Sequence, residues 1–234
     1  MGSPTRFPSG VTNVASDTTF GQTGIPDPTS WHVFMDDFDR FAAGDWTITT
    51  VEAGAGSATE ALTDADGGVL LITNDAADDD SDFFNKVGES FLLEAGKKAA
   101  FKARFKVSDA TQSDFVMGLQ ITDTTPLAVS DGIWFQKDDG DALLDVYCGK
   151  SSGAGTTSAT AIATVVADTY LTVGWAYDGK GSLRYFVNDV QLGTLDASST
   201  YLPDTELTVS FGIQNGEAVA KTMSVDYVCV MKER

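Results

Sequence analysis

The chain has 234 residues, a formal net charge of −19 and a single histidine. Its 42% hydrophobic content is enough for a buried core, and its length suits one large β domain. The 27 Asp far outnumber the 7 Glu, and Asp prefers turns to helix interiors, so a helical bundle is excluded. The acidic balance excludes a nucleic-acid partner, which would require a stripe of Lys and Arg. No apolar run approaches the roughly 20 residues of a membrane span, so no membrane partner is expected.

The first residues lack the charged and then apolar layout of a secretory signal, and Arg6 stands where a myristoylation signal has Ser or Thr. Cys148 and Cys229 are far apart and form no C-x-x-C motif. This spacing fits neither a disulfide scaffold nor a zinc site, so we expect two buried thiols in strands.

Residues 1–32 are expected to form an extended N-terminal arm. They hold four of the six prolines and show no apolar period. Scattered apolar residues such as Phe7, Phe20 and Trp31 favour docking along a neighbouring subunit, with disorder as the alternative. Residues 33–234 are then a single domain.

Beyond Phe34, short runs with a period of two alternate with Gly, Asp and Asn clusters, which is typical of an all-β protein. Residues 101–107 show it best, because apolar residues occupy every second position and cations lie between them. We expect about thirteen strands without helical interruption. They close most naturally as two antiparallel sheets packed face to face, a jelly-roll sandwich.

Other expected strands cover residues 46–51, 69–73, 115–122, 132–137, 143–148, 159–166, 170–177, 182–187, 207–213 and 224–231. Asn188-Asp189 is placed for a two-residue hairpin turn. The segment 151–160 contains only Gly, Ser, Thr and Ala, and we expect a loop there.

Catalysis through histidine would have to use His32, which lies at the edge of the arm. The chain has no G-x-S-x-G elbow, no phosphate-binding Gly loop and no H-E-x-x-H motif. Glycoside hydrolysis stays open in principle, since it needs only two carboxylates at a fixed separation.

Several short motifs follow one another over residues 34–234: residues 34–39 (FMDDFD), Trp46, 66–71 (DGGVLL), 101–107, Trp175, 185–188 (YFVN) and 225–228 (VDYV). Their order resembles that of the concanavalin A-like lectin/glucanase jelly rolls, and most closely that of the laminarinase-type glycoside hydrolases. The resemblance implies a concanavalin A-like jelly-roll fold.

Those hydrolases carry their catalytic carboxylates as a Glu-x-Asp-x-x-Glu run on one inner strand. The strands that would take this place, residues 132–137 and 143–148, offer no Glu pair. We therefore predict no catalytic residues and no enzyme activity, leaving open only an unrelated arrangement of Asp.

In similar jelly rolls a calcium ion links the N-terminal strand to the last one. The resemblance implies that its ligands here are the main-chain oxygens of Asp37 and Gly67 and the carboxylate of Asp226. The alternative is that Asp226 caps a backbone group or pairs with a nearby cation. No other cofactor is expected.

Two acidic runs and a set of aromatic residues could also carry function. Residues 75–82 contain five Asp but lack the Gly and distal Glu of an EF-hand, so a solvated acidic loop is expected. Residues 138–141 (DDGD) are expected to form a hairpin turn. The strand aromatics Trp134, Phe135, Tyr147 and Trp175 are expected to pack in the core, with a sugar-stacking platform on the concave sheet as the alternative.

Longer stretches resemble virion structural proteins of tailed bacteriophages: residues 4–14 (PTRFPSGVTNV), 103–109 (ARFKVSD), 118–126 (GLQITDTTP) and 210–217 (SFGIQNGE). The resemblance implies a non-enzymatic capsid decoration protein on the virion surface, with the major capsid protein and other copies of itself as partners. A homo-oligomer, first of all a trimer, is expected. The alternative is a carbohydrate-binding adhesin on a head or tail fibre, followed by a glycoside hydrolase.

Overall fold

The computed structural model describes residue 19 and residues 29–65, 67–151 and 155–234. These residues form sixteen strands and two single-turn 3-10 helices: β1 Trp31–Asp36, η1 Ala43–Asp45, β2 Trp46–Val51, β3 Thr59–Leu62, β4 Leu70–Thr73, β5 Ser81–Lys86, β6 Phe91–Leu92, β7 Ala99–Val107, β8 Ser113–Gln120, η2 Pro126–Ala128, β9 Gly132–Lys137, β10 Leu143–Lys150, β11 Gly155–Thr164, β12 Leu171–Tyr177, β13 Ser182–Val187, β14 Val190–Asp196, β15 Glu206–Asn215 and β16 Thr222–Glu233. Among the described residues, no helix is long or apolar enough to cross a membrane.

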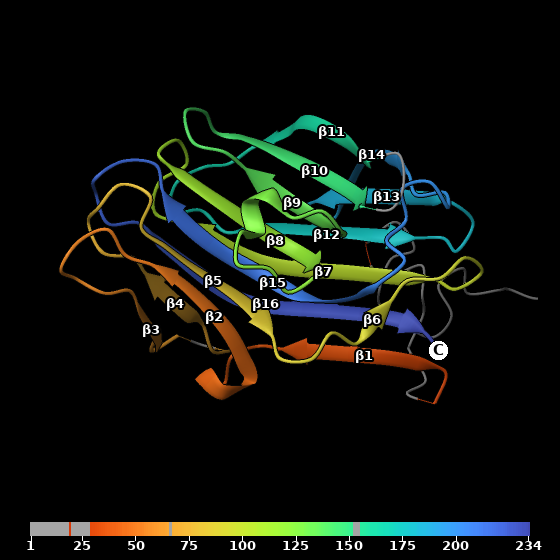
Figure 1. The fold of residues 1–234 in the computed structure, drawn as a ribbon, viewed down its shortest axis with the longest axis horizontal. Helices are drawn as coiled ribbons and strands as arrows, with labels where there is room; N and C mark the ends of the chain where they lie inside the picture. The colour runs from red at the N-terminus through yellow and green to blue at the C-terminus, as the bar shows by residue number, and fades with distance from the viewer. Residues whose placement is uncertain (1–18, 20–28, 66, 152–154) are drawn as a thin grey trace, which may run out of the picture.

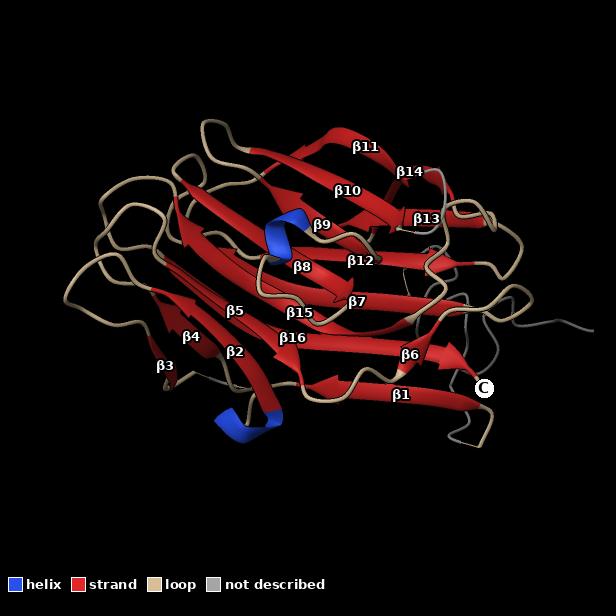
Figure 2. Ribbon diagram, in the orientation of Figure 1, coloured by secondary structure: helices blue, strands red, loops and turns tan. Residues whose placement is uncertain are grey.

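The strands form two antiparallel sheets that pack face to face (Figure 1). One sheet has the order β14-β13-β12-β7-β16-β4-β3, with β1 paired to β16. The other has the order β11-β10-β9-β8-β15-β5-β2, with β6 paired to β15. The prediction of an all-β jelly-roll sandwich is thereby confirmed, and Figure 2 shows how little helix the fold contains.

Period-two alternation decides which side chains face the core. In β7, Phe101, Ala103 and Phe105 are fully buried, whereas Lys102 and Arg104 face outward. Opposite them, the second sheet contributes residues such as Phe211 of β15, which stacks on Phe84 of β5 with ring centroids 5.1 Å apart. Both predicted buried thiols, Cys148 and Cys229, are free and buried. The core therefore lies between the sheets.

The first and the last strand lie side by side in the first sheet. Strand β1 runs antiparallel to β16, with Trp31 opposite Glu233 and Asp36 opposite Val228. Trp31 and His32, which the sequence analysis placed in the arm, thus belong to the sheet. The other predicted arm residues lie outside the described residues, except Thr19 and residues 29–30.

Two sequence-based expectations about local structure are wrong. Residues 155–160 are not loop but the start of β11, which pairs with β10. An exposed edge strand requires few apolar residues, so the Ser/Thr composition is tolerated there. Strand β5 was missed because its acidic Asp82 and polar Asn85 hide the alternation, yet both residues are fully buried.

Candidate functional site

The outer face of β8, β9 and β10 carries the most elaborate set of polar and aromatic side chains in the second sheet. The register places Tyr147 of β10 opposite Trp134 of β9, and Asp145 opposite Gln136. These four side chains alternate with core residues such as Phe135 and Val146, so they share the face that points away from the other sheet.

The two rings form a stack whose orientation is fixed by hydrogen bonds. Their centroids lie 5.2 Å apart, with 17° between the ring planes. Trp134 Nε1 donates to Gln136 Oε1 at 2.8 Å, and Gln136 Nε2 donates to Asp138 Oδ1 at 2.7 Å. Trp134 is 4% exposed, whereas Tyr147 is only half-buried. One aromatic face is thus held rigidly at the surface.

Asp145 sits at a β-bulge. The pairing of β10 with β11 shifts register between Leu144 and Val146, so Asp145 has no partner residue on β11. Its Oδ1 accepts from Ala161 N at 2.8 Å, and its Oδ2 accepts from Tyr147 OH at 3.0 Å. Ala161 has a φ of 54°, which is costly for a residue with a Cβ. Bulges and such strain occur beside functional sites, where they redirect a side chain.

A cavity of about 240 Å³ adjoins this face, and four carboxylates line it. Its walls are Asp138, Asp139, Asp141, Leu143, Asp145, Thr160 and Ala161. The predicted hairpin turn at residues 138–141 supplies three of these carboxylates, and Gly140 takes the positive φ, 91°, that the turn requires.

Asp114 of β8 lies next to the turn 138–141 and is 8% exposed. Its Oδ1 accepts from Asp139 N at 2.7 Å. Burial, to which the nearby charge of Asp139 adds, raises the pKa of Asp114 to about 6. Asp114 and Asp145 were not predicted as site residues from the sequence. The feature that could have indicated them is a carboxylate within a mostly apolar strand.

The segment 121–131, which includes η2, folds over the neighbouring part of the same face (Figure 2). Its Val129 belongs to a small cluster with Phe83, Val116 and Trp134. Gln120 Nε2 donates to Pro126 O at 3.0 Å and holds the segment down. The open part of the face is therefore the side occupied by Tyr147 and Asp145.

Only two of the four predicted platform aromatics share a face. Phe135 points into the core, and Trp175 belongs to the other sheet, where it stacks on Phe101 at a centroid distance of 6.1 Å. The expectation of core packing is confirmed for Phe135 and Trp175. Trp134 is also buried, but under the segment 121–131 rather than between the sheets.

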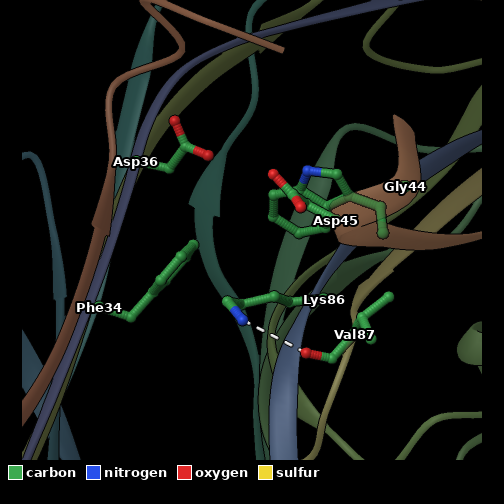
Figure 3. Close-up of a pocket in the computed structure, with 7 residues that line it drawn as sticks. Phe34, Asp36, Gly44, Asp45, Lys86 and Val87 are labelled. Atoms are coloured by element: carbon green, nitrogen blue, oxygen red, sulfur yellow. Dashed lines mark hydrogen bonds between the residues drawn. The ribbon is translucent and has the colours of Figure 1, made fainter. Parts of the chain in front are cut away.

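A second cavity, of about 320 Å³, lies between β1 and β2 (Figure 3). Asp36 and Asp45 point toward it, and Lys86 Nζ lies 5.1 Å from the ring centroid of Phe34. Burial raises the pKa of Asp36. Lys86 Nζ donates to Val87 O at 3.3 Å and Asp36 Oδ1 accepts from Phe38 N at 2.8 Å, so the polar groups of this cavity are engaged in local structure.

The segments that hold the three predicted calcium ligands belong to or adjoin the neighbouring strands β1, β4 and β16 of the first sheet. In β16 the register shifts between Val225 and Tyr227, which puts Asp226 between the end of β1 and the start of β4. Gly68, next to the predicted ligand Gly67, packs against the carbonyl of Asp37. The carboxylate of Asp226, however, forms an ion pair with Arg104. Calcium at Asp37, Gly67 and Asp226 stays a prediction, and it would compete there with a guanidinium group.

Among the known proteins compared with this chain, the matches come from solved structures. No family model and no curated protein matches the chain. Among solved structures, it resembles an endo-1,3-β-glucanase from Streptomyces sioyaensis (17% identity, 89% of this chain and 99% of that one, TM-score 0.61). It also resembles a glycoside hydrolase family 16 endo-glucanase from Bacteroides ovatus (17%, 83% and 98%, 0.60) and an endo-β-1,4-glucuronan lyase from Trichoderma reesei (12%, 84% and 94%, 0.55).

The fold is a concanavalin A-like jelly roll. The prediction of a non-enzymatic capsid decoration protein is contradicted, because the structures that resemble this chain include several glucanases and none of those compared is a virion protein. Two of the stretches on which that prediction rested, 103–109 and 118–126, include parts of β7 and β8. Residue choice in such strands reflects packing in the sheets, so a likeness there indicates a shared fold and not a shared function. The capsid partner, the trimer and the virion location stay predictions.

Proposed function

We propose that this chain recognises a neutral β-linked glucan on the outer face of β8, β9 and β10. The observation that carries the proposal is the half-buried ring of Tyr147, stacked on Trp134 beside a carboxylate-lined cavity. Aromatic faces bind the apolar faces of sugar rings, and carboxylates accept hydrogen bonds from sugar hydroxyls. The structural neighbours that act on glucans support this class of ligand.

The negative charge of the cavity determines that neutral glycans are favoured over acidic ones. The cavity places Asp138, Asp139, Asp141 and Asp145 together, within a chain of net charge −19. A uronate would be repelled there, so the site favours glucan over the glucuronan on which one structural neighbour acts.

A glycan array probed with the full-length protein tests this proposal. Neutral β-1,3- and mixed-linkage β-glucans are expected to bind, while uronate polymers are expected not to bind. Tyr147→Ala should abolish the signal, and Tyr170→Ala, which removes a ring from the outer face of the other sheet, should preserve it. Binding to uronates alone, or binding that survives Tyr147→Ala, would refute it.

Hydrolysis of the bound glucan is a second candidate function, favoured by the environment of Asp114. Glycoside hydrolysis requires one protonated and one ionised carboxyl group. Burial raises the pKa of Asp114 to about 6, and Asp145, which lines the cavity, would be the second carboxyl group. Release of reducing ends from a β-1,3-glucan that stops in Asp145→Asn would establish the activity; wild-type protein that releases none would dismiss it.

A further inference from the structure

Five carboxyl groups gather at the end of the sandwich where β2, β3, β4 and β5 meet. Glu52 follows β2, Glu60 lies in β3, Asp75 follows β4, Asp80 precedes β5 and Asp82 lies in it. The sequence analysis predicted residues 75–82 as a solvated acidic loop. That prediction is wrong for Asp80 and Asp82, because both are fully buried.

Three of these groups are close enough to share one ion. Carboxylate oxygens of Glu52, Asp75 and Asp80 all lie within 4.8 Å of one another. Asp82 lies in β5, two residues after Asp80, and pairs in register with Thr50 of β2. Like charges at this spacing repel each other strongly, and more so where water is excluded.

Two oxygens of the group are buried without a donor. Thr50 Oγ1 donates to Asp82 Oδ1 at 2.7 Å, but Asp82 Oδ2 and Glu52 Oε2 accept no hydrogen bond. Among the described residues, none of the ion pairs reaches this group. A buried anionic oxygen without a partner is costly, and a bound cation would offset that cost.

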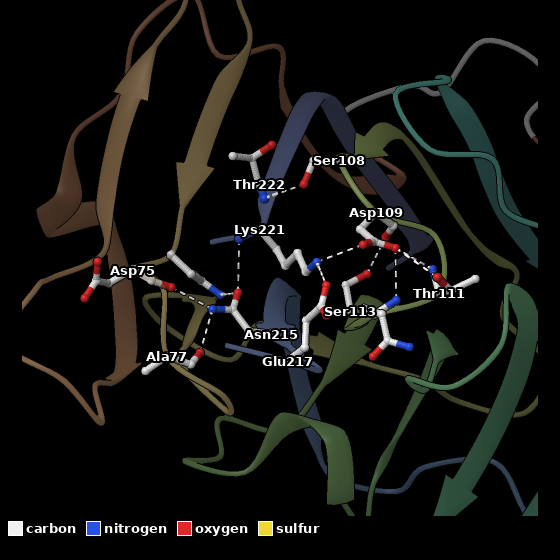
Figure 4. A network of polar contacts seen from close by, with 12 residues as sticks. Asp75, Ala77, Ser108, Asp109, Thr111, Ser113, Asn215, Glu217, Lys221 and Thr222 are labelled. Atoms are coloured by element: carbon white, nitrogen blue, oxygen red, sulfur yellow. Dashed lines mark hydrogen bonds and ion pairs between the residues drawn. The ribbon is translucent and has the colours of Figure 1, made fainter. Parts of the chain in front are cut away.

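The backbone around the carboxylates is firmly held. Asn215 Nδ2 donates to Asp75 O at 2.6 Å and to Ala77 O at 2.8 Å (Figure 4). Asn74 Nδ2 donates to Asp80 O at 2.9 Å, and the Asp80 carboxylate accepts from Ala53 N at 2.6 Å. The positions of the oxygens are therefore preorganised.

The loop between β2 and β3 is shaped around the same group. The Glu52 carboxylate accepts from Ala58 N, and any side chain at position 56 would overlap the carboxylate of Asp75, which explains Gly56. The loops 53–58 and 74–80 thus close on one acidic centre from two sides.

We propose that Glu52, Asp75 and Asp80 bind a calcium ion, with Asp82 and Glu60 completing the negative surroundings. Only hard oxygen donors are present, and they come from irregular loops and strand ends. Calcium accepts such flexible arrangements of carboxylates, whereas magnesium requires a near-octahedral shell. The ion would join the loops 53–58 and 74–80 and would stabilise that end of the sandwich. This site is separate from the predicted set at Asp37, Gly67 and Asp226.

Calorimetric titration of the full-length, chelator-treated protein with calcium chloride tests the proposal. The wild type is expected to bind one more calcium ion than Glu52→Gln/Asp75→Asn, a variant that keeps acceptor oxygens at both positions. Asp226→Asn is the matched control and should retain the ion that the double variant loses. The proposal is overturned if the wild type binds no calcium, if the double variant binds as many ions as the wild type, or if Asp226→Asn binds none.

Melting temperatures measured with and without calcium show whether the double variant loses calcium binding merely because it folds poorly. In chelator, the double variant should melt at or above the wild-type temperature, because it removes repelling charges. Added calcium should raise the melting temperature of the wild type more than that of the double variant. An equal rise in both proteins would overturn the proposal.

Discussion

Tyr147 of β10 lies nearly parallel to Trp134 of β9, with ring centroids 5.2 Å apart, yet Trp134 is buried in a cluster with Val129 whereas Tyr147 packs against that cluster and is only half-buried. We therefore expect the two rings to differ in their contribution to stability. Trp134→Ala should lower the free energy of unfolding by about 3–5 kcal/mol, the cost of a large core cavity. Tyr147→Ala should lower it by about 1 kcal/mol. Urea denaturation measures both, and equal losses would mean that Tyr147 is a packing residue.

Asp114 should make stability depend on pH. Its pKa is raised from 3.8 to about 6 in the folded protein, so the folded state binds more protons between these values. Its favourable contribution is full below pH 4 and is lost as the pH rises through about 6. The Asp114→Asn variant should remove this loss, on the order of 1–3 kcal/mol.

Thermal unfolding of Asp114→Asn and wild type between pH 4 and 8 measures the difference. The exposed Asp64→Asn is the control, since it removes the same charge without burial. Parallel pH profiles for wild type and Asp114→Asn would contradict the assignment.

Lys221 is a buried cation held by two carboxylates. Its side chain is 4% exposed, and Nζ lies 2.8 Å from Asp109 Oδ2 and 2.6 Å from Glu217 Oε1 (Figure 4). The two carboxylates that remain are 28% and 44% exposed and keep much of their hydration, so Lys221→Met should cost about 1–2 kcal/mol through the lost ion pairs. Lys97→Met breaks a pair with Glu94 that is about 40% exposed and should cost less than about 1 kcal/mol. Chemical denaturation separates the two, and similar costs would count against the network.

Two adjacent glycines at the start of β4 should respond differently to the same change. Gly68 has a φ of 73°, and a Cβ there would lie 2.5 Å from the backbone of Phe38. Gly67 has a φ of 88° but open space around it. Gly67→Ala should therefore cost about 1 kcal/mol and Gly68→Ala clearly more. Thermal denaturation of the two variants checks this order, which the reverse result would contradict.

The fold could be predicted from the sequence because a strand that buries one face alternates apolar and polar residues. Residues 132–137 and 182–187 were predicted with the bounds that the structure shows. Strands on exposed edges, such as β3 and β14, have little to bury and left no such pattern. The turn at Asn188-Asp189 was predicted correctly, and both residues take positive φ, 50° and 61°.

The candidate sites were harder to predict, because their residues come together only through strand pairing. A β-bulge at Asp145 positions its side chain at the cavity. No pattern in the sequence predicts where a bulge occurs. The acidic residues 75–82 looked solvated, since one-dimensional charge density does not show that Glu52 and Glu60 approach Asp80 and Asp82 from other strands. The absence of a Glu pair was visible in the sequence, but the prediction of no enzyme activity that was drawn from it is contradicted by the resemblance to glucanase structures.

Calorimetric titration with a soluble mixed-linkage β-glucan tests most directly whether the outer face of β8, β9 and β10, which holds Tyr147, binds neutral glucan. Saturable binding by the wild type, weakened at least about tenfold in Tyr147→Ala and unchanged in Tyr170→Ala, is the predicted result. No heat of binding to the wild type, or equal affinity in Tyr147→Ala, would contradict the account.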